Sequence, residues 1–280
     1  MKRMGIDEVQ AVLLDLMKEV HKFLCENKIK YYLLGGSALG AVRHDGFIPW
    51  DDDIDIGLFR DDYEKFLDIS SRFNPKYEVV NFQKANNCDF GLTRIYIPNT
   101  YIDNRTTKKT KLDKRLYFDV FPLDNVPEDK TELGKYEVKV VKMKHLLQLI
   151  DVRDYGNSRP IMVAKKAVSM VLRPFRGIIL RSFDNLLKNY RQYETAYICS
   201  LCSQYSFKKQ VMLKEIYGKP VLHAFEDTSL YIPENIHAYL STLFGADYMC
   251  LPPEEKRRPG LDIYWLNEDS DVSNIDEIKG

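Results

Sequence analysis

Residues 33–58 read LLGGSALGAVRHDGFIPWDDDIDIGL. A short apolar strand is expected to end before Gly35, Gly36 and Ser37, and a helix over 38–42 is expected to follow them. Glycines let a phosphate approach the backbone closely, and a helix start offers free N–H groups and the positive end of the helix dipole. We therefore predict that the Gly-Gly-Ser turn binds phosphate and that Ser37 also caps the helix.

The second pattern in this stretch is the alternation of acidic and apolar residues at 53–58, which predicts a strand. Side chains two apart in a strand share a face, so Asp53 and Asp55 would project together, and Asp51 shares their parity. Such close carboxylates resist joint ionisation unless a cation neutralises them. Hard oxygen ligands suit Mg²⁺ or Mn²⁺. The pattern favours a metal site over a solvated acidic turn.

The glycine–serine turn and the paired aspartates together resemble the nucleotidyltransferase superfamily of the DNA polymerase β type. The resemblance implies a third carboxylate on a nearby strand. Asp119 is the candidate, because it lies in an apolar strand expected over 117–121, where an unpaired carboxylate is costly. Metal binding would remove that cost, and a salt bridge is the alternative. Asp124, which follows this strand, is expected to cap a turn, with metal binding as the alternative.

A closer resemblance is to the LicD family of phosphocholine-transferase-like proteins, which are related to the fukutins. The segments that carry it are GGSALGAVRHDGFIPWDDDIDIG at 35–57, Arg94 with Thr100, FDVFPLD at 118–124, and FGADYM with LPP at 244–253. The resemblance as a whole extends over roughly residues 7–255. The chain departs from the family pattern after Pro253, where Arg257 and Arg258 stand and no histidine can be matched.

The resemblance implies an enzyme that transfers a phospho-alcohol from a CDP-linked donor to a glycan hydroxyl. The preferred donor is CDP-choline, and the acceptor is a cell-surface glycan such as lipopolysaccharide or teichoic acid, or a lipid-linked precursor. Asp53, Asp55 and Asp119 would be the catalytic residues and the ligands of one or two Mg²⁺ ions in an in-line displacement that releases CMP. CDP-ribitol, CDP-glycerol, nucleotidyl transfer to a small molecule and an inactive scaffold are the alternatives.

Three further side chains near these motifs are candidates for substrate binding. Arg43 is expected to clamp the donor phosphate, or else to form an ion pair that orients Asp51 or Asp52. His44 is adjacent and weaker, with a loop hydrogen bond as its alternative. Arg94 is a second phosphate ligand or the partner in a structural ion pair.

The periodicity along the rest of the chain predicts an α+β fold. Helices are expected over 7–26 and 61–73, and strands over 77–82, 92–97 and 117–121. This gives a nucleotidyltransferase core with a small mixed sheet over 1–130. A mainly helical part that covers the donor or acceptor is expected over 131–266, with helices at 130–150 and 161–198 broken at Arg173-Pro174. Residues 267–280 would form a flexible acidic tail.

The composition excludes several classes of protein. Lys and Arg number 41 and so do Asp and Glu, which argues against a nucleic-acid partner. We found no apolar run of about 20 residues for a membrane span and no signal-peptide core at the start, so a cytoplasmic protein is expected. Five cysteines are few and odd in number, which argues against a disulfide scaffold. Cys199 and Cys202 form a C-x-x-C without a second pair at zinc spacing.

Residues 161–191 are strongly basic, with seven Lys and Arg against Asp184 alone. Apolar residues interleave with these charges. Two interpretations follow. The segment docks on an anionic membrane that carries a lipid-linked acceptor, or it forms a helical layer that packs on the sheet with a solvated basic face.

Overall fold

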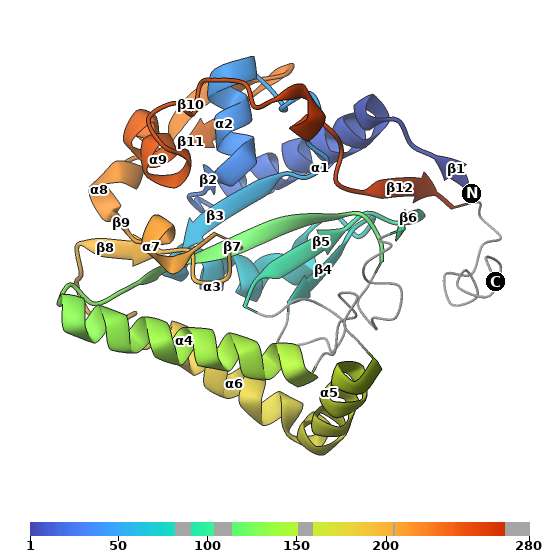
Figure 1. Ribbon diagram of the computed structural model, residues 1–280. Helices are drawn as coiled ribbons and strands as arrows, with labels where there is room; N and C mark the ends of the chain where they lie inside the picture. The colour runs from blue at the N-terminus through green and yellow to red at the C-terminus, as the bar shows by residue number, and fades with distance from the viewer. Residues whose placement is uncertain (82–90, 104–113, 151–158, 204, 267–280) are drawn as a thin grey trace.

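The computed structural model describes residues 1–81, 91–103, 114–150, 159–203 and 205–266 (Figure 1). A mixed sheet runs through the centre. Its strand order is β2 (Tyr32–Leu33), β3 (Asp55–Phe59), β7 (Tyr117–Asn125), β5 (Thr93–Tyr96) and β4 (Glu78–Asn81). β3 and β7 are parallel, and the other neighbours in this order are antiparallel. The strands expected over 77–82, 92–97 and 117–121 are confirmed within a few residues.

Three N-terminal helices pack around this sheet: α1 (Ile6–Glu26), α2 (Gly35–His44) and α3 (Arg60–Ile69), the last continued by η1 (Ser70–Arg72). α1 confirms the helix predicted over 7–26, and buries the apolar residues that recur along one face: Val9, Leu13, Leu16, Met17, Val20 and Leu24. α2 begins three residues earlier than a Ser37 cap requires. Leu34 occupies the N-cap position, so the prediction that Ser37 caps this helix is wrong.

Three helices follow β7 in the chain: α4 (Lys130–Ile150), α5 (Arg159–Leu172) and α6 (Arg176–Leu187). The short helix η2 (Arg173–Phe175) separates α5 from α6, at the break that Pro174 predicts. α4 packs against both α5 and α6. In Figure 1 these three helices lie below the sheet, while α1, α2 and α9 lie above it.

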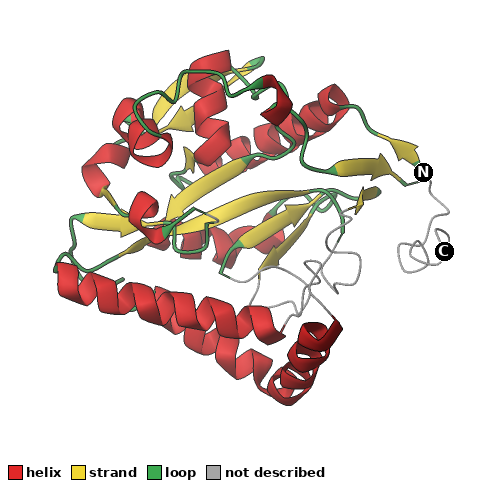
Figure 2. Cartoon of the chain, viewed as in Figure 1, coloured by secondary structure: helices red, strands yellow, loops and turns green. Residues whose placement is uncertain are grey.

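The chain from residue 197 to 266 contains strands that the sequence pattern did not indicate (Figure 2). β8 (Tyr197–Cys199) pairs with the end of β7 and with β9 (Met212–Leu213). β10 (Val221–Phe225) and β11 (Thr228–Ile232) form a hairpin. β12 (Asp262–Trp265) lies between β1 (Lys2–Arg3) and β6 (Thr100–Asp103). The remaining elements are α7 (Phe207–Gln210), α8 (Lys214–Tyr217), α9 (Ile236–Phe244) and η3 (Glu254–Lys256).

These added strands tie the second half of the chain to the first. The division at residue 130 stays a prediction, and the predicted tail at 267–280 lies outside the described residues. The main core gathers around β3 and β7, where Ile56, Leu58 and Phe118 are fully buried. A second apolar cluster joins α4 and α6 through Tyr136, Leu147 and Phe183 among others. Among the described helices, none combines the length and apolarity that crossing a membrane requires.

Candidate active site

A cavity of about 360 Å³ lies where β3, β5 and β7 meet the segment after β8. Its lining includes Asp53, Asp55, Asp119 and Arg94 from the sheet side. Gly35 also lines it, at the start of α2. The cavity therefore collects five of the residues that the sequence analysis singled out, although they lie up to 84 positions apart in the chain.

The strand register explains how three of these side chains meet. Asp55 on β3 is opposite Asp119 on β7, and Arg94 on β5 is opposite the same Asp119. Directly opposed residues of neighbouring strands present their side chains on the same face. Arg94 Nε donates to Asp119 Oδ1 at 2.9 Å, and its guanidinium lies 3.7 Å from the centre of the Tyr117 ring. Arg94 thus has the ion pair that was its alternative, and it stands inside the candidate site.

The remaining carboxylates come from the segment just before β3. Asp53 lies outside the strand, which begins at Asp55 rather than at residue 53, yet it still lines the cavity. It lies close enough to Asp51 for each of the two side chains to shift the pKa of the other. Asp51, Asp53 and Asp55 therefore form one contiguous acidic group beside Asp119.

Burial and mutual repulsion raise the pKa of every member of this acidic group. Burial, together with the charges of Asp51, Asp52 and Asp119, raises the pKa of Asp53 to about 8. Burial and the charge of Asp52 raise the pKa of Asp51 to about 6. The pKa of Asp55 is raised by burial and by its acidic neighbours, and Arg94 opposes this rise. The site therefore holds more negative charge than its own cation offsets.

A divalent cation fits this group in ligand chemistry and in charge, because the carboxylate oxygens are hard ligands that repel one another. Within the described residues, however, no three His, Cys, Asp or Glu side chains converge closely enough to hold a metal ion as they stand. Asp53, Asp55 and Asp119 share a cavity wall without forming a closed ligand set. Metal binding at these three residues stays a prediction.

The Gly-Gly-Ser turn lies directly against the acidic group and contacts Asp51 and Asp55. Gly35 has φ +51°, a conformation that favours glycine, and its N–H donates to the Tyr239 hydroxyl at 2.9 Å. A Cβ atom on Gly36 would lie 2.7 Å from Asp51 Oδ2. Ser37 Oγ accepts a hydrogen bond from the Asp55 N–H at 2.9 Å. The close approach at this turn is thus to carboxylates of the chain itself, and Ser37 fixes the start of β3.

Arg43 and His44 lie away from the cavity lining. α2 continues to His44, and Arg43 donates to the backbone oxygens of Tyr248 and Cys250 at 3.1 and 3.3 Å. Arg43 Nε donates to His44 Nε2 at 3.0 Å. The Arg43 guanidinium does not form the expected ion pair with Asp51 or Asp52, because α2 directs this side chain toward residues 248–250. Asp52 instead accepts the Leu261 N–H at 2.7 Å.

One wall of the cavity comes from residues that sequence reasoning missed. Lys144 and Gln148 extend from α4, and the others follow β8 or lie on α7 and α9: Ser200, Cys202, Ser203, Tyr205, Gln210 and Tyr239. Lys144 Nζ donates to the backbone oxygens of Leu201 and Ser203 at 3.2 and 3.3 Å. Apart from Cys202 of the C-x-x-C, these residues belong to no motif in the sequence. The small polar run SLCSQYS at 200–206 was the one available hint.

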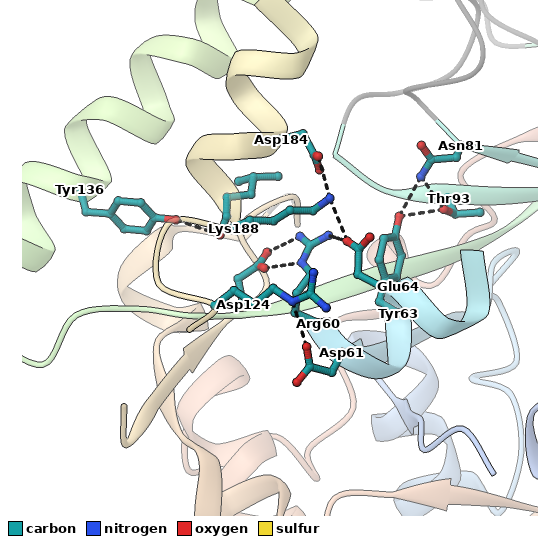
Figure 3. A network of polar contacts seen from close by, with 12 residues as sticks. Arg60, Asp61, Tyr63, Glu64, Asn81, Thr93, Asp124, Tyr136, Asp184 and Lys188 are labelled. Atoms are coloured by element: carbon teal, nitrogen blue, oxygen red, sulfur yellow. Dashed lines mark hydrogen bonds and ion pairs between the residues drawn. The ribbon is translucent and has the colours of Figure 1, made fainter. Parts of the chain in front are cut away.

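Asp124 belongs to a different buried polar group, on the other side of β7 (Figure 3). Its two carboxylate oxygens accept from Arg60 Nε and from a terminal nitrogen of Arg60 at 2.6 and 2.7 Å. Arg60 also pairs with Glu64, and Lys188 bridges Glu64 and Asp184 at 2.9 and 2.7 Å. The expectation that Asp124 caps a turn is therefore wrong.

Comparison with known proteins finds a matching family model and several relatives of this chain. A family model described as the LicD/FKTN/FKRP nucleotidyltransferase domain matches residues 28–149. The lipopolysaccharide cholinephosphotransferase LicD of Haemophilus influenzae is 30% identical over 272 residues, which cover 92% of this chain and 97% of that protein.

Two further relatives match shorter segments. An uncharacterized protein of Rickettsia prowazekii is 34% identical over 133 residues, which cover 45% of this chain and 48% of that protein. The ribitol 5-phosphate transferase FKRP of Mus musculus is 53% identical over 34 residues, which cover 12% of this chain and 7% of that protein. The family match includes the sheet side of the cavity and also Lys144 and Gln148 of α4.

Proposed function

The chain belongs to the LicD family, and we propose that it transfers a phosphorylated alcohol from a nucleotide-linked donor to a hydroxyl group of a glycan. Two relatives bear the names of a cholinephosphotransferase and a ribitol 5-phosphate transferase, and both names describe this class of reaction. The observation that carries the proposal is the cavity in which Asp53, Asp55 and Asp119 gather beside Arg94.

We assign phosphocholine as the transferred group and CDP-choline as the donor. The relative that supports this choice is similar over nearly its whole length, whereas the ribitol-phosphate transferase is similar over 34 residues. The acceptor would be a cell-surface glycan or its precursor. The core would have the polymerase β-like nucleotidyltransferase fold, in which sheet carboxylates carry the chemistry.

The reaction is an in-line displacement at the phosphorus that bears the alcohol. The glycan oxygen attacks this phosphorus, the bond to CMP breaks, and the hydroxyl proton leaves to a carboxylate of the cavity. Asp53, Asp55 and Asp119 would hold Mg²⁺ or Mn²⁺, which would neutralise the diphosphate and the CMP leaving group.

The other residues of the cavity would position these groups. Arg94 holds the Asp119 carboxylate through its Nε–H, and packing on Tyr117 fixes the guanidinium plane. Gly35 keeps the start of α2 narrow enough for a diphosphate to approach. Lys144 contributes a positive charge from the opposite wall. Phosphoryl transfer depends mainly on such positioning and charge stabilisation.

A ligand-binding experiment tests this proposal without an acceptor. The thermal unfolding midpoint is measured in Mg²⁺ with CDP-choline, CDP-glycerol, CDP-ribitol, CTP, ATP or UDP-glucose, for the wild type and for Asp53→Asn. A ligand at about 100 times its Kd stabilises by about 2.7 kcal/mol. We expect a Mg²⁺-dependent rise with CDP-choline that the variant loses.

The control for this experiment is Asp68→Asn, which removes an exposed carboxylate from α3 and should keep the full rise. A larger rise with CDP-ribitol or CDP-glycerol would reassign the alcohol and keep the reaction class. A rise with ATP and none with cytidine ligands would contradict the proposal and favour nucleotidyl transfer to a small molecule.

A further inference from the structure

α5 and the turn after it expose a dense group of large apolar side chains. Of the fifteen exposed large apolar residues in the described part of the chain, seven lie between residues 161 and 178: Ile161, Val163, Val168, Met170, Val171, Phe175 and Ile178. Met170, Val171 and Val163 are 74%, 69% and 67% exposed. Scattered exposed apolar residues need no explanation, but a contiguous group marks an interaction site.

The helical geometry places the most exposed of these residues on one face. Val163, Met170 and Val171 are separated by seven and eight positions, which is the spacing of one helix face. The opposite face of α5 holds Lys165 and Ser169, which are partly buried. The Ser169 hydroxyl donates to the backbone oxygen of Ile150, the last residue of α4, at 2.6 Å. α5 therefore turns its apolar face outward, the reverse of a helix that covers a core in water.

Unpaired positive charge flanks this apolar face. Lys166, Arg173 and Arg181 are exposed, and no acidic residue occurs between positions 159 and 183. Among the described residues these three make no ion pair. Lys188 and Arg191 differ, because they pair with carboxylates of α3 and α6. Lys166, Arg173 and Arg181 therefore carry positive charge that no carboxylate within the described part of the chain offsets.

We propose that α5 and η2 form a docking surface for an anionic lipid bilayer. A bilayer offers an apolar interior for Val163, Met170 and Val171, and negative headgroups for the flanking cations. No span is needed, because the helix would lie in the interface with its apolar face in the headgroup–acyl boundary. The interpretation of this segment as a layer with its apolar side packed on the sheet fits α6, whose Leu180 and Phe183 are buried, but not α5.

The position of this surface relative to the cavity indicates how membrane docking would serve the reaction. α4 lines the cavity with Lys144 and Gln148 and contacts α5 at its own C-terminal end. In Figure 1 α4 runs below the sheet, and α5 lies beside the C-terminal end of α4. Docking through α5 would hold the cavity close to the bilayer, where a glycan acceptor on a lipid carrier is concentrated. This last step rests on the proposed function, whereas the docking itself does not.

Co-sedimentation with vesicles tests the docking. Vesicles of phosphatidylcholine alone and of phosphatidylcholine mixed with phosphatidylglycerol are compared for the wild type, for Met170→Glu with Val171→Glu, and for Leu222→Glu. Leu222 is a matched control, because it is 54% exposed on β10, far from α5 in Figure 1. We expect the wild type and Leu222→Glu to pellet with the anionic vesicles, and the α5 variant to remain in the supernatant.

The contribution of charge is measured with Lys166→Gln and Arg173→Gln. Each removed cation should lower the partition coefficient about fivefold on anionic vesicles, and added salt should lower that of the wild type. Equal pelleting of the wild type and the α5 variant would overturn the proposal. So would a wild-type dimer that Met170→Glu dissociates in analytical ultracentrifugation without lipid, because the face would then join two copies of the chain.

The same preparations separate this proposal from the proposed function. The donor-induced rise in unfolding temperature requires no membrane, so the α5 variant should keep it. Vesicle binding requires no donor, so Asp53→Asn should still pellet. A wild type that shows the donor response and does not pellet contradicts the docking alone, and one that pellets without any donor response contradicts the proposed function alone.

Discussion

Strand β7 delivers a carboxylate to each of two buried polar groups, and the two groups are built on opposite principles. Asp119 faces the cavity, and Asp124, five positions later, faces the other side of the sheet. The Asp124 carboxylate forms an ion pair with the Arg60 guanidinium. Nearby, Lys188 forms ion pairs with both Glu64 and Asp184. Asp119 pairs with Arg94 and belongs to a cluster that also contains Asp51, Asp53 and Asp55.

The contrast shows what distinguishes a structural group from a binding site. In the Arg60 network each carboxylate has a cation within ion-pair distance, although burial still raises the pKa of Asp124. In the cavity the carboxylates outnumber the two cations, Arg94 and Lys144. Burial raises the pKa of Asp53, Asp55 and Asp119, and repulsion adds to the rise for Asp53 and Asp55. Perturbed carboxylates that open onto a cavity mark a candidate functional site, and we propose that a bound cation offsets their charge.

The largest expected effect is the loss of turnover in Asp55→Asn. This change removes a cavity carboxylate and keeps the size of the side chain, so turnover should fall on the order of a thousandfold. The free energy of unfolding should stay the same or rise, because a repulsive charge is removed. Steady-state release of CMP and urea denaturation measure the two quantities, with Asp68→Asn as the control. If the variant unfolds more easily and turns over normally, Asp55 has a structural role and not a catalytic one.

Arg60→Met should have the opposite pattern. It leaves Asp124 buried without its cation, which costs about 3–5 kcal/mol of unfolding free energy. The rise in unfolding temperature with the donor should persist. Replacing the pair together, as Arg60→Met with Asp124→Leu, should recover most of the lost stability in urea denaturation. Failure of the double variant to recover would show that the network does more than balance charge.

The next effect concerns pH in metal-free protein. The pKa of Asp53 is about 8 in the folded state and about 3.9 in an unfolded chain. Because the folded state holds this proton more tightly, stability is greatest at low pH and falls as the pH rises between these two values. The unfolding temperature in a chelator should therefore fall more steeply from pH 5 to pH 8 for the wild type than for Asp53→Asn. Equal slopes would contradict this origin, and added Mg²⁺ should flatten the wild-type slope.

The smallest effect concerns the hydrogen bond that fixes the acidic cluster. Ser37→Ala removes the acceptor of the Asp55 N–H, which should cost about 1 kcal/mol of unfolding free energy. Turnover should be lower in Ser37→Ala than in the control variant Ser71→Ala, because β3 would lose the hydrogen bond that holds its start at Asp55. Ser71 is an exposed serine in η1. An unchanged turnover in Ser37→Ala would show that other contacts hold Asp55 in place.

The sequence predicted the acidic side of the site because its residues lie in local patterns. Asp53 and Asp55 are two positions apart, and the resemblance to known nucleotidyltransferases directed attention to Asp119. The helix break at Pro174 and the apolar face of α1 were equally local. The Arg94 ion pair was foreseen as an alternative, and the strand register then brought it into the cavity.

The features that sequence reasoning missed depend on distant contacts. Arg60 meets Asp124 across 64 positions, so a turn cap was the local interpretation of Asp124. Lys144 reaches the cavity only because α4 packs beneath the sheet and β8 joins β7. Ser37 was misassigned because the helix begins at Gly35, whose positive φ no pattern of residue types reveals.

The central claim is that the unbalanced carboxylates form the site for the cation and the donor. Isothermal titration calorimetry with Mn²⁺, in the presence of CDP-choline, tests it most directly on the wild type, Asp55→Asn and Asp68→Asn. The account predicts saturable Mn²⁺ binding in the wild type and in Asp68→Asn, and at least a tenfold weaker affinity in Asp55→Asn, a loss of about 1.4 kcal/mol or more. Equal affinities in all three proteins would contradict it.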